Sequence, residues 1–195
     1  MKPAAVLDLG RRPYQETWDL QKELVAQRQS DAIPDTLVLV EHPDVITLGR
    51  RLHAAANVLA PGDIPVVEIE RGGDATYHGP GQLVGYPIFK LDGDERDLHG
   101  YLRSLEEALI GVCGDFGLTG GRNPGWTGVW IGPRKVASLG IAVRRWVTMH
   151  GFALNVATDL ARFAAINPCG LDATVMTSLA RESGRPLTLD RKSVV

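Results

Sequence analysis

Apolar residues recur along the chain at two spacings, and these predict strands interspersed with helices. Over Leu98–Phe116 they return every three or four positions, and 14–29 shows the same spacing less regularly, so both segments are predicted helices. Short apolar runs between glycine-rich or polar stretches predict strands. The predicted strands are 4–9, 36–40, 46–49, 66–69, 83–89, 129–131, 135–143 and 147–156. Because several strands follow one another directly, we expect an α+β fold with a mixed β-sheet flanked by helices.

Length and composition favour one globular domain spanning residues 1–195. The chain has 195 residues, of which 44% are hydrophobic, which suffices for one sizeable core. A net charge of −2 argues against a nucleic-acid-binding protein, which would carry a basic face. No apolar run approaches the roughly 18 residues of a membrane span, and the first residues lack a secretory signal, so we expect a cytoplasmic protein that binds no membrane. We also expect a monomer.

One segment, RGGDATYHGPGQLVGYP at residues 71–87, combines a glycine-rich polar loop with an apolar strand. Gly72 and Gly73 allow a ligand to approach the backbone, and Pro80-Gly81 predicts the turn that precedes the strand. Polar and ionisable side chains crowd the positions between them. The segment therefore predicts one wall of a small-molecule pocket, although a solvated surface hairpin would show the same residues.

The two cysteines occupy different sequence contexts. Cys113 lies on the apolar stripe of the 98–116 helix, which predicts a buried structural thiol. Cys169 lies in INPCGLD, between Pro168 and Gly170, where the backbone must turn. A thiol on such a turn can face a cleft and react, or it can be an incidental loop residue.

Lys135 begins the predicted strand KVASLGIAV in a chain that has 16 arginines and only five lysines. Unlike arginine, which stays charged, lysine can shift its pKa and take or give a proton, so Lys135 is a candidate acid/base group. A solvated lysine at a strand end is the alternative. Small residues share faces of this strand and of the strand TMHGFALNV that follows. Such faces leave room for a bound chain or allow close sheet packing.

Four motifs taken in order, RGGDATYHGPGQLVGYP, KVASLGI, HGFALNV and NPCG, resemble the lipoyl(octanoyl) transferases over most of the chain. Enzymes of this family transfer octanoyl groups from an acyl carrier protein to proteins during lipoate synthesis. The resemblance implies the fold of the catalytic domains of lipoate and biotin protein ligases.

The resemblance also implies roles for individual residues. Cys169 would be the nucleophile that carries the octanoyl group as a thioester, and Lys135 its acid/base partner. No ATP and no other cofactor would be needed. The residues implied to bind the acyl substrate are Arg71, Gly72, Gly73, Asp74, Ala75, Thr76, Tyr77, His78, Ser138, Leu139, Gly140, Gly151, Phe152 and Ala153.

Two protein partners follow from the same resemblance. The donor would be octanoyl-acyl carrier protein, and the acceptors would be lipoyl domains of 2-oxoacid dehydrogenases and the glycine cleavage H protein. Arginines that could contact an acidic carrier are Arg50, Arg51, Arg134, Arg144 and Arg145, each of which could instead be a solvated surface residue.

The histidines predict neither a metal site nor a catalytic base. His42 and His53 lack the spacing of metal ligands. His78 could carry a proton but is better suited to fixing its loop, and His150 is expected to pack or bond locally.

Three other function classes fit parts of the sequence. An ATP-dependent lipoate ligase would share the fold but would not need a cysteine nucleophile. A cysteine protease or amidase would need a histidine base, and no histidine has a sequence context that ties it to Cys169. A non-catalytic acyl-carrier-binding module would not need both Lys135 and Cys169.

Overall fold

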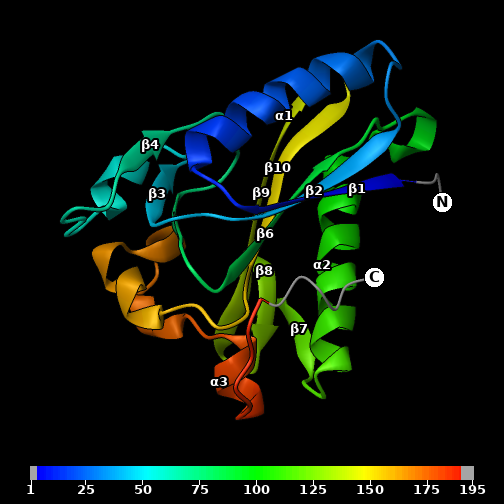
Figure 1. Cartoon of the computed structure of the whole chain (residues 1–195). Coiled ribbons are helices and arrows are strands. Elements are labelled where there is room, and N and C mark those ends of the chain that lie inside the picture. The colour runs from blue at the N-terminus through cyan, green and yellow to red at the C-terminus, as the bar shows by residue number, and fades with distance from the viewer. Residues whose placement is uncertain (1–3, 190–195) are drawn as a thin grey trace.

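A seven-stranded mixed sheet runs through the computed structural model, which describes residues 4–189 except for the side chain of Cys169 (Figure 1). Only the edge pair β1–β2 is parallel, and every other neighbouring pair is antiparallel. In spatial order the strands are β1 (Ala4–Arg11), β2 (Asp35–Glu41), β6 (Gln82–Ile88), β10 (Val147–Asn155), β9 (Arg134–Arg144), β8 (Trp126–Ile131) and β7 (Gly120–Asn123). The predicted α+β class with a mixed sheet is confirmed.

A second, three-stranded sheet contains a strand that the sequence pattern did not predict. Its order is β4 (Val66–Glu68), β3 (Val45–Leu48) and β5 (Ala75–His78). We predicted a loop over 71–78, and this is wrong for its second half, because β5 pairs antiparallel with β3 and all four of its residues are buried. Polar residues in a buried strand need partners from elsewhere in the fold, which a local pattern does not reveal.

The two long helices cover opposite faces of the large sheet, as Figure 1 shows. The helix α1 (Tyr14–Gln29) packs on β6 and β10 beside a core that includes Val38, Val84 and Met149. The helix α2 (Leu98–Asp115) packs on β7, β8 and β9 beside a second core that includes Leu109 and Val136. Both predicted helices are confirmed. The apolar stripe of α2 buries Cys113 completely, as predicted.

The last helix is shorter than the sequence pattern indicates. Helical spacing begins at Met176, but α3 comprises only Leu179–Ser183. Met176 instead forms a parallel bridge with Lys135 of β9, which draws this segment toward the large sheet before the helix starts. Within residues 4–189, no helix is long and apolar enough to cross a membrane.

Candidate active site

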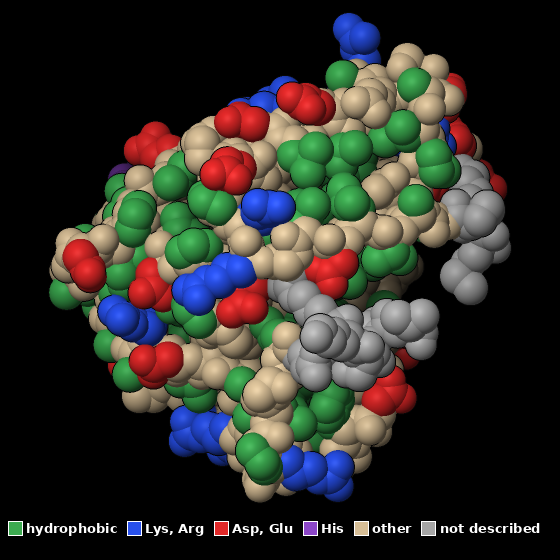
Figure 2. Space-filling view, viewed as in Figure 1, with side chains coloured by type: hydrophobic (Ala, Val, Ile, Leu, Met, Phe, Trp, Pro, Cys, Tyr) green, Lys and Arg blue, Asp and Glu red, His purple; other side chains and the backbone are tan. Residues whose placement is uncertain are grey.

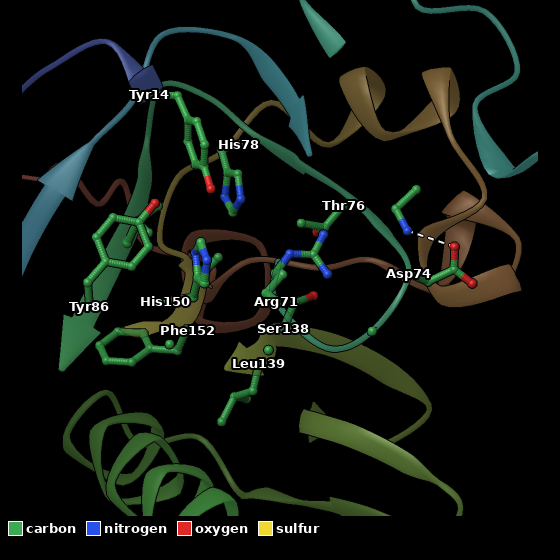
Figure 3. A pocket seen from close by; sticks show the side chains of 16 residues that line it. Tyr14, Arg71, Asp74, Thr76, His78, Tyr86, Ser138, Leu139, His150 and Phe152 are labelled. Carbon is green, nitrogen blue, oxygen red and sulfur yellow. Dashed lines mark hydrogen bonds between the residues drawn. The ribbon is translucent and has the colours of Figure 1, made fainter. Parts of the chain in front are cut away.

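A pocket that is partly open to solvent lies among β5, β6, β9, β10 and the segment that leads into β5 (Figure 3). Its walls include every residue predicted to bind the acyl substrate except Gly72 and Tyr77. The shared residues are Arg71, Gly73, Asp74, Ala75, Thr76, His78, Ser138, Leu139, Gly140, Gly151, Phe152 and Ala153. The structure thus brings together three segments that are distant in sequence.

The two predicted residues that do not line the cavity, Tyr77 and Gly72, contact neighbouring segments instead. Tyr77 lies in β5, where successive side chains alternate, and its ring faces Phe163 at 5.2 Å while its hydroxyl donates to Asp44 Oδ1 at 2.6 Å. Gly72 donates its backbone N–H to the carbonyl of Ile141 at 2.8 Å. This bond fastens the glycine-rich loop to β9.

The small residues on β9 and β10 permit backbone segments to approach closely. A Cβ on Gly140 would lie 2.8 Å from the carbonyl oxygen of Gly72, and one on Gly151 would lie 2.3 Å from that of Gly85. Real Cβ atoms do not come that near to backbone, so larger residues would push these segments apart. The small faces predicted from sequence therefore bring the cavity walls together as well as leaving space.

Four wall residues were missed in the sequence analysis: Tyr14, Val84, Tyr86 and His150. Val84 and Tyr86 alternate along β6, and this period of two, next to the glycine-rich loop, could have indicated them. Tyr14 begins α1 and was assigned to that helix's apolar face. His150 was expected to bond locally, but its side chain lies beside Phe152 and faces the cavity (Figure 3).

The backbone of His150 is unusual for a strand. Its φ is +56°, a left-handed value that costs energy in a residue other than glycine, and its N–H donates to Gln21 Oε1 of α1 at 2.8 Å. The ring nitrogen Nε2 lies 3.6 Å from Glu70 Oε2, which is too far for a hydrogen bond. A helix side chain thus accepts the backbone N–H of His150 in place of a strand carbonyl, while this residue stays in register with Ile141 of β9.

Burial keeps two histidines of the cavity wall, His78 and His150, uncharged. Loss of solvent lowers the pKa of His78 to about 3 and the pKa of His150 to about 4, so both rings are neutral at pH 7. His78 shares a hydrogen bond of 2.7 Å with Gln82 Oε1, a contact that favours the structural role expected for it. The Arg71 guanidinium donates to the backbone and hydroxyl oxygens of Thr47 at 2.9 and 3.0 Å. The uncharged rings of His78 and His150 suit an alkyl chain better than charged rings would.

Lys135 is not among the residues that line the cavity, and it lies three residues before the lining residue Ser138 on β9. Its side chain is only 1% exposed, so the alternative of a solvated strand-end lysine is wrong. Its Nζ lies 5.7 Å from the ring centroid of Trp130. Lysine side chains are rarely buried to this extent, so Lys135 is unlike an ordinary surface lysine.

The segment that carries Cys169 is anchored on both sides of the site. The single turn η4 (Pro168–Gly170) packs against β5. Just before it, the N–H of Asn167 donates to the carbonyl of Asn57 at 2.7 Å, and beyond it the N–H of Thr177 donates to the carbonyl of Lys135 at 2.9 Å. The turn that contains Cys169 therefore lies against β5, and the chain reaches Lys135 at Met176 and Thr177; the side chain of Cys169 lies outside the described residues.

Among the arginines that were predicted to contact a protein partner, two form ion pairs with glutamates and two border the cavity through their backbone. Arg134 forms a double ion pair with Glu182 at 2.6 and 2.7 Å, and Arg144 pairs with Glu70 at 3.0 Å. Arg50 and Arg51 instead border the cavity, because their N–H groups donate to the carbonyls of Arg71 and Gly73 at 3.0 Å.

The sequence matches known proteins over most of its length. A family model described as the lipoyl protein ligase A/B catalytic domain matches residues 13–193. A protein named octanoyltransferase from Geobacter metallireducens is 52% identical over 97% of this chain and 89% of its own. Another octanoyltransferase, from Gloeobacter violaceus, is 54% identical over 87% of this chain and 77% of its own.

Comparisons of structure confirm the fold that the resemblance implied. Lipoate-protein ligase A bound with ATP superposes with a TM-score of 0.69 at 18% identity, over 91% of this chain and 76% of that one. A bipartite lipoate protein ligase from Thermoplasma acidophilum gives a TM-score of 0.64 at 18% identity, over 97% and 75% of the two chains. Together with the sequence matches, these findings place the chain in the octanoyltransferase family, which has the lipoyl protein ligase A/B catalytic domain.

Proposed function

We propose that this protein transfers an octanoyl group from acyl carrier protein to a lysine of a lipoyl domain, with Cys169 as nucleophile and Lys135 as acid/base partner. The observation that supports the proposal is the placement of Lys135, which is buried on the strand that carries Ser138 and accepts through its carbonyl from the N–H of Thr177, eight residues after Cys169. The similarity of this chain to octanoyltransferases supports an octanoyl group as the group transferred.

In the first half-reaction, Lys135 accepts the proton of the Cys169 thiol, and the thiolate attacks the carbonyl carbon of the carrier's thioester. A new carbon–sulfur bond forms to Cys169, and the bond to the phosphopantetheine sulfur breaks. The departing thiolate takes the proton back from the Lys135 ammonium. Since one thioester replaces another, this step is nearly balanced in free energy.

In the second half-reaction, the amine of the acceptor lysine attacks the acyl-cysteine. Lys135, now neutral, takes a proton from that amine as the amide bond forms and Cys169 departs as a thiolate. An amide is more stable than a thioester, so this step gives the overall transfer its direction without ATP.

The cavity beside Ser138 and Gly140 would hold the alkyl chain. Burying a methylene contributes about 0.8 kcal/mol, so the roughly six methylenes of octanoate contribute on the order of 5 kcal/mol to binding. The uncharged rings of His78 and His150 oppose this burial less than charged rings would.

The partners proposed are octanoyl-acyl carrier protein as donor and, as acceptors, lipoyl domains of 2-oxoacid dehydrogenases and of the glycine cleavage H protein. A cysteine nucleophile operates best where thiols stay reduced, which favours the cytoplasm. We propose a monomer in solution, which light scattering on the purified protein tests.

The deciding experiment is intact-protein mass spectrometry after mixing the protein with octanoyl-acyl carrier protein, followed by addition of a lipoyl domain. We expect a thioester-labile octanoyl adduct on the wild type, none on Cys169→Ala, and slow formation on Lys135→Ala. The acceptor should discharge the adduct. Octanoylation that required ATP and free octanoate would point to a ligase, and no transfer under either condition would point to a non-catalytic binding module.

A further inference from the structure

A buried carboxylate on α2, that of Glu106, has no part in the reaction described above. Its side chain is 1% exposed, which is rare for a glutamate. Oxygen Oε2 accepts from Arg103 Nη1 at 2.7 Å and from Arg122 Nε at 3.0 Å. Oxygen Oε1 accepts from the backbone N–H of Gly128 in β8 at 2.9 Å. The arginines balance the charge, and the second oxygen holds the β8 backbone.

Gly128 lies directly against the side chain of Lys135. A Cβ at Gly128 would be 2.5 Å from Lys135 Cε and 3.2 Å from Nζ. The φ of Gly128 is +142°, a conformation that side-chain-bearing residues rarely adopt. The backbone of Gly128 therefore forms one wall of the space that the end of the lysine occupies.

The pairing of β8 with β9 also changes at this point. Val129 pairs with Ala137 and Trp130 pairs with Lys135, so β9 contains one extra residue, Val136, between these pairs. A bulge of this kind redirects the neighbouring side chains. The direction of the Lys135 side chain thus depends on the path of β8 just after Gly128.

Glu106 is not required simply to attach α2 to the sheet. Arg122 of β7 also donates to Glu107 Oε2 at 2.7 Å and to the carbonyl of Arg103 at 3.0 Å, both on α2. These bonds tie the helix to β7 without Glu106. The contact that Glu106 alone supplies is the one to Gly128.

We propose that Glu106 is a positioning residue for Lys135, acting through the backbone of Gly128 to fix where the amine stands beside the acyl-transfer site. The inference rests on the proposed role of Lys135 in the reaction. It assigns to Glu106 a contribution to the rate of acyl transfer and none to the binding of the carrier.

Two substitutions separate the hydrogen bond from the charge. Glu106→Asp keeps the negative charge near the arginines but withdraws the oxygen from Gly128, whereas Glu106→Gln keeps an acceptor for Gly128 and loses the charge. Glu107→Asp is the matched control, because Glu107 shares Arg122 but does not contact Gly128. Each variant is compared with wild type for the rate of octanoyl-enzyme formation, the KM for octanoyl carrier and the rate of iodoacetamide alkylation at Cys169 at pH 7.

We expect Glu106→Asp to lower the acylation rate and the Cys169 alkylation rate about tenfold with KM unchanged, since small displacements of a reacting group are costly. Glu106→Gln and Glu107→Asp should stay within about threefold of wild type. Equal effects of the Asp and Gln substitutions at Glu106, or a Glu106→Asp variant that behaves as wild type, would overturn the inference.

Two further variants keep the outcome decisive. If thermal unfolding shows that Glu106→Asp does not fold, Gly128→Ala takes its place, with Gly121→Ala of β7 as control because a Cβ there meets no atom within 4 Å. Only the former should lose rate, and equal rates would reject the inference. Lys135→Ala is measured in parallel. If this variant acylates normally, the proposed role of Lys135 is wrong. If Lys135→Ala is defective but the Glu106 variants are normal, only the inference about Glu106 is rejected.

Discussion

Gly85 illustrates how one missing side chain shapes the cavity. It pairs with Phe152 across β6 and β10, and a Cβ at Gly85 would lie 2.2 Å from the Phe152 ring. We predict that Gly85→Ala displaces this ring, destabilises the protein by about 1–2 kcal/mol and raises the KM for the octanoyl donor several-fold. Steady-state kinetics and urea unfolding measure both effects, with Gly121→Ala as the neutral control. An unchanged KM would show that the Phe152 ring does not form the acyl-binding wall.

The buried histidines predict a dependence of stability on pH. In the unfolded chain a histidine titrates near 6.5, whereas the folded-state pKa is about 3 for His78 and about 4 for His150. Below pH 6.5 the unfolded chain therefore binds protons that the folded protein does not. The stability present above pH 6.5 is lost as pH falls from 6.5 toward these values, by about 1.4 kcal/mol per pH unit for each histidine.

Urea unfolding at pH 7, 6 and 5 tests this dependence. We expect His78→Asn to show a smaller loss of stability between pH 7 and 5 than the wild type, because one titrating group has been removed. His53→Asn, at an exposed position, should retain the wild-type slope. Identical slopes in all three proteins would mean that His78 does not contribute.

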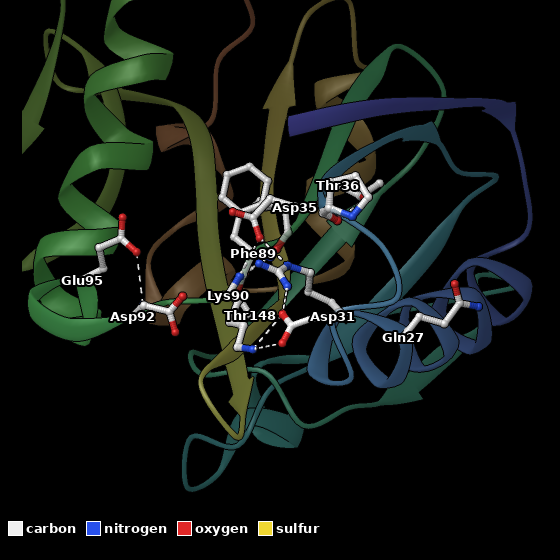
Figure 4. Close-up of polar contacts among 12 residues, drawn as sticks. Gln27, Asp31, Asp35, Thr36, Phe89, Lys90, Asp92, Glu95 and Thr148 are labelled. Atoms are coloured by element: carbon white, nitrogen blue, oxygen red, sulfur yellow. Dashed lines mark hydrogen bonds and ion pairs between the residues drawn. The ribbon is translucent and has the colours of Figure 1, made fainter. Parts of the chain in front are cut away.

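At the scale of elements, a cluster of charges joins the end of α1 to the start of β2 and to the segment that follows β6 (Figure 4). Asp35, at the start of β2, accepts from Arg28 Nε at 2.7 Å and from the N–H of Lys90 at 2.9 Å. Asp31 contacts Arg28 and Lys90 as well, but its side chain is 62% exposed, against 10% for Asp35. Burial therefore distinguishes two aspartates with similar partners.

We predict that Asp35→Ala lowers the free energy of unfolding by about 2–3 kcal/mol, because it leaves the Arg28 charge and the Lys90 N–H without their buried acceptor. Asp31→Ala should have a much smaller effect, since solvent replaces an exposed partner. Urea unfolding of the two variants gives the comparison. Equal losses would contradict the dominance of burial.

Elements with a strong apolar pattern could be predicted from sequence, and those held by tertiary contacts could not. The stripe along Leu98–Phe116 predicted α2 to within one residue, because a helix must bury that face. The strands β5 and β7 were missed, since β5 buries polar residues and β7 is the glycine-rich segment Gly120–Asn123. The strand β1 was found, but its exposure at the sheet edge, 65% for Val6, does not follow from its apolar residues.

At the scale of the whole molecule, the sequence motifs located most of the cavity wall but not the part that Tyr14 and His150 form. The loop before β5 and the small faces of β9 and β10 carry signals that a local pattern can reveal, and the structure brings them together. Tyr14 and His150 reach the cavity because α1 packs across β10 and its Gln21 bonds to the His150 N–H. Those placements depend on the docking of a helix onto the sheet, which no single segment encodes.

The surface of the molecule bears on where the acyl carrier docks. Acidic and basic side chains are interspersed over the face shown in Figure 2, so a broad electrostatic field does not select a partner there. Docking then depends on local groups near the cavity. Arg50 and Arg51 are both exposed and their backbone borders the cavity wall. Arg51 has only a long ion pair, of 3.8 Å, with Asp74, whereas Arg144 pairs with Glu70 at 3.0 Å.

We therefore predict that replacing Arg50 and Arg51 together by alanine raises the KM for octanoyl-acyl carrier protein about tenfold at low salt and leaves kcat nearly unchanged. Arginine recognises phosphate and carboxylate groups, and both occur on an acidic carrier with its phosphopantetheine arm. The difference in KM should shrink as salt is raised toward 0.5 M, because screening weakens exposed charge contacts. The double alanine variant of Arg144 and Arg145 is the comparison: if that pair raises KM and the first pair does not, the carrier docks at the β9–β10 turn instead.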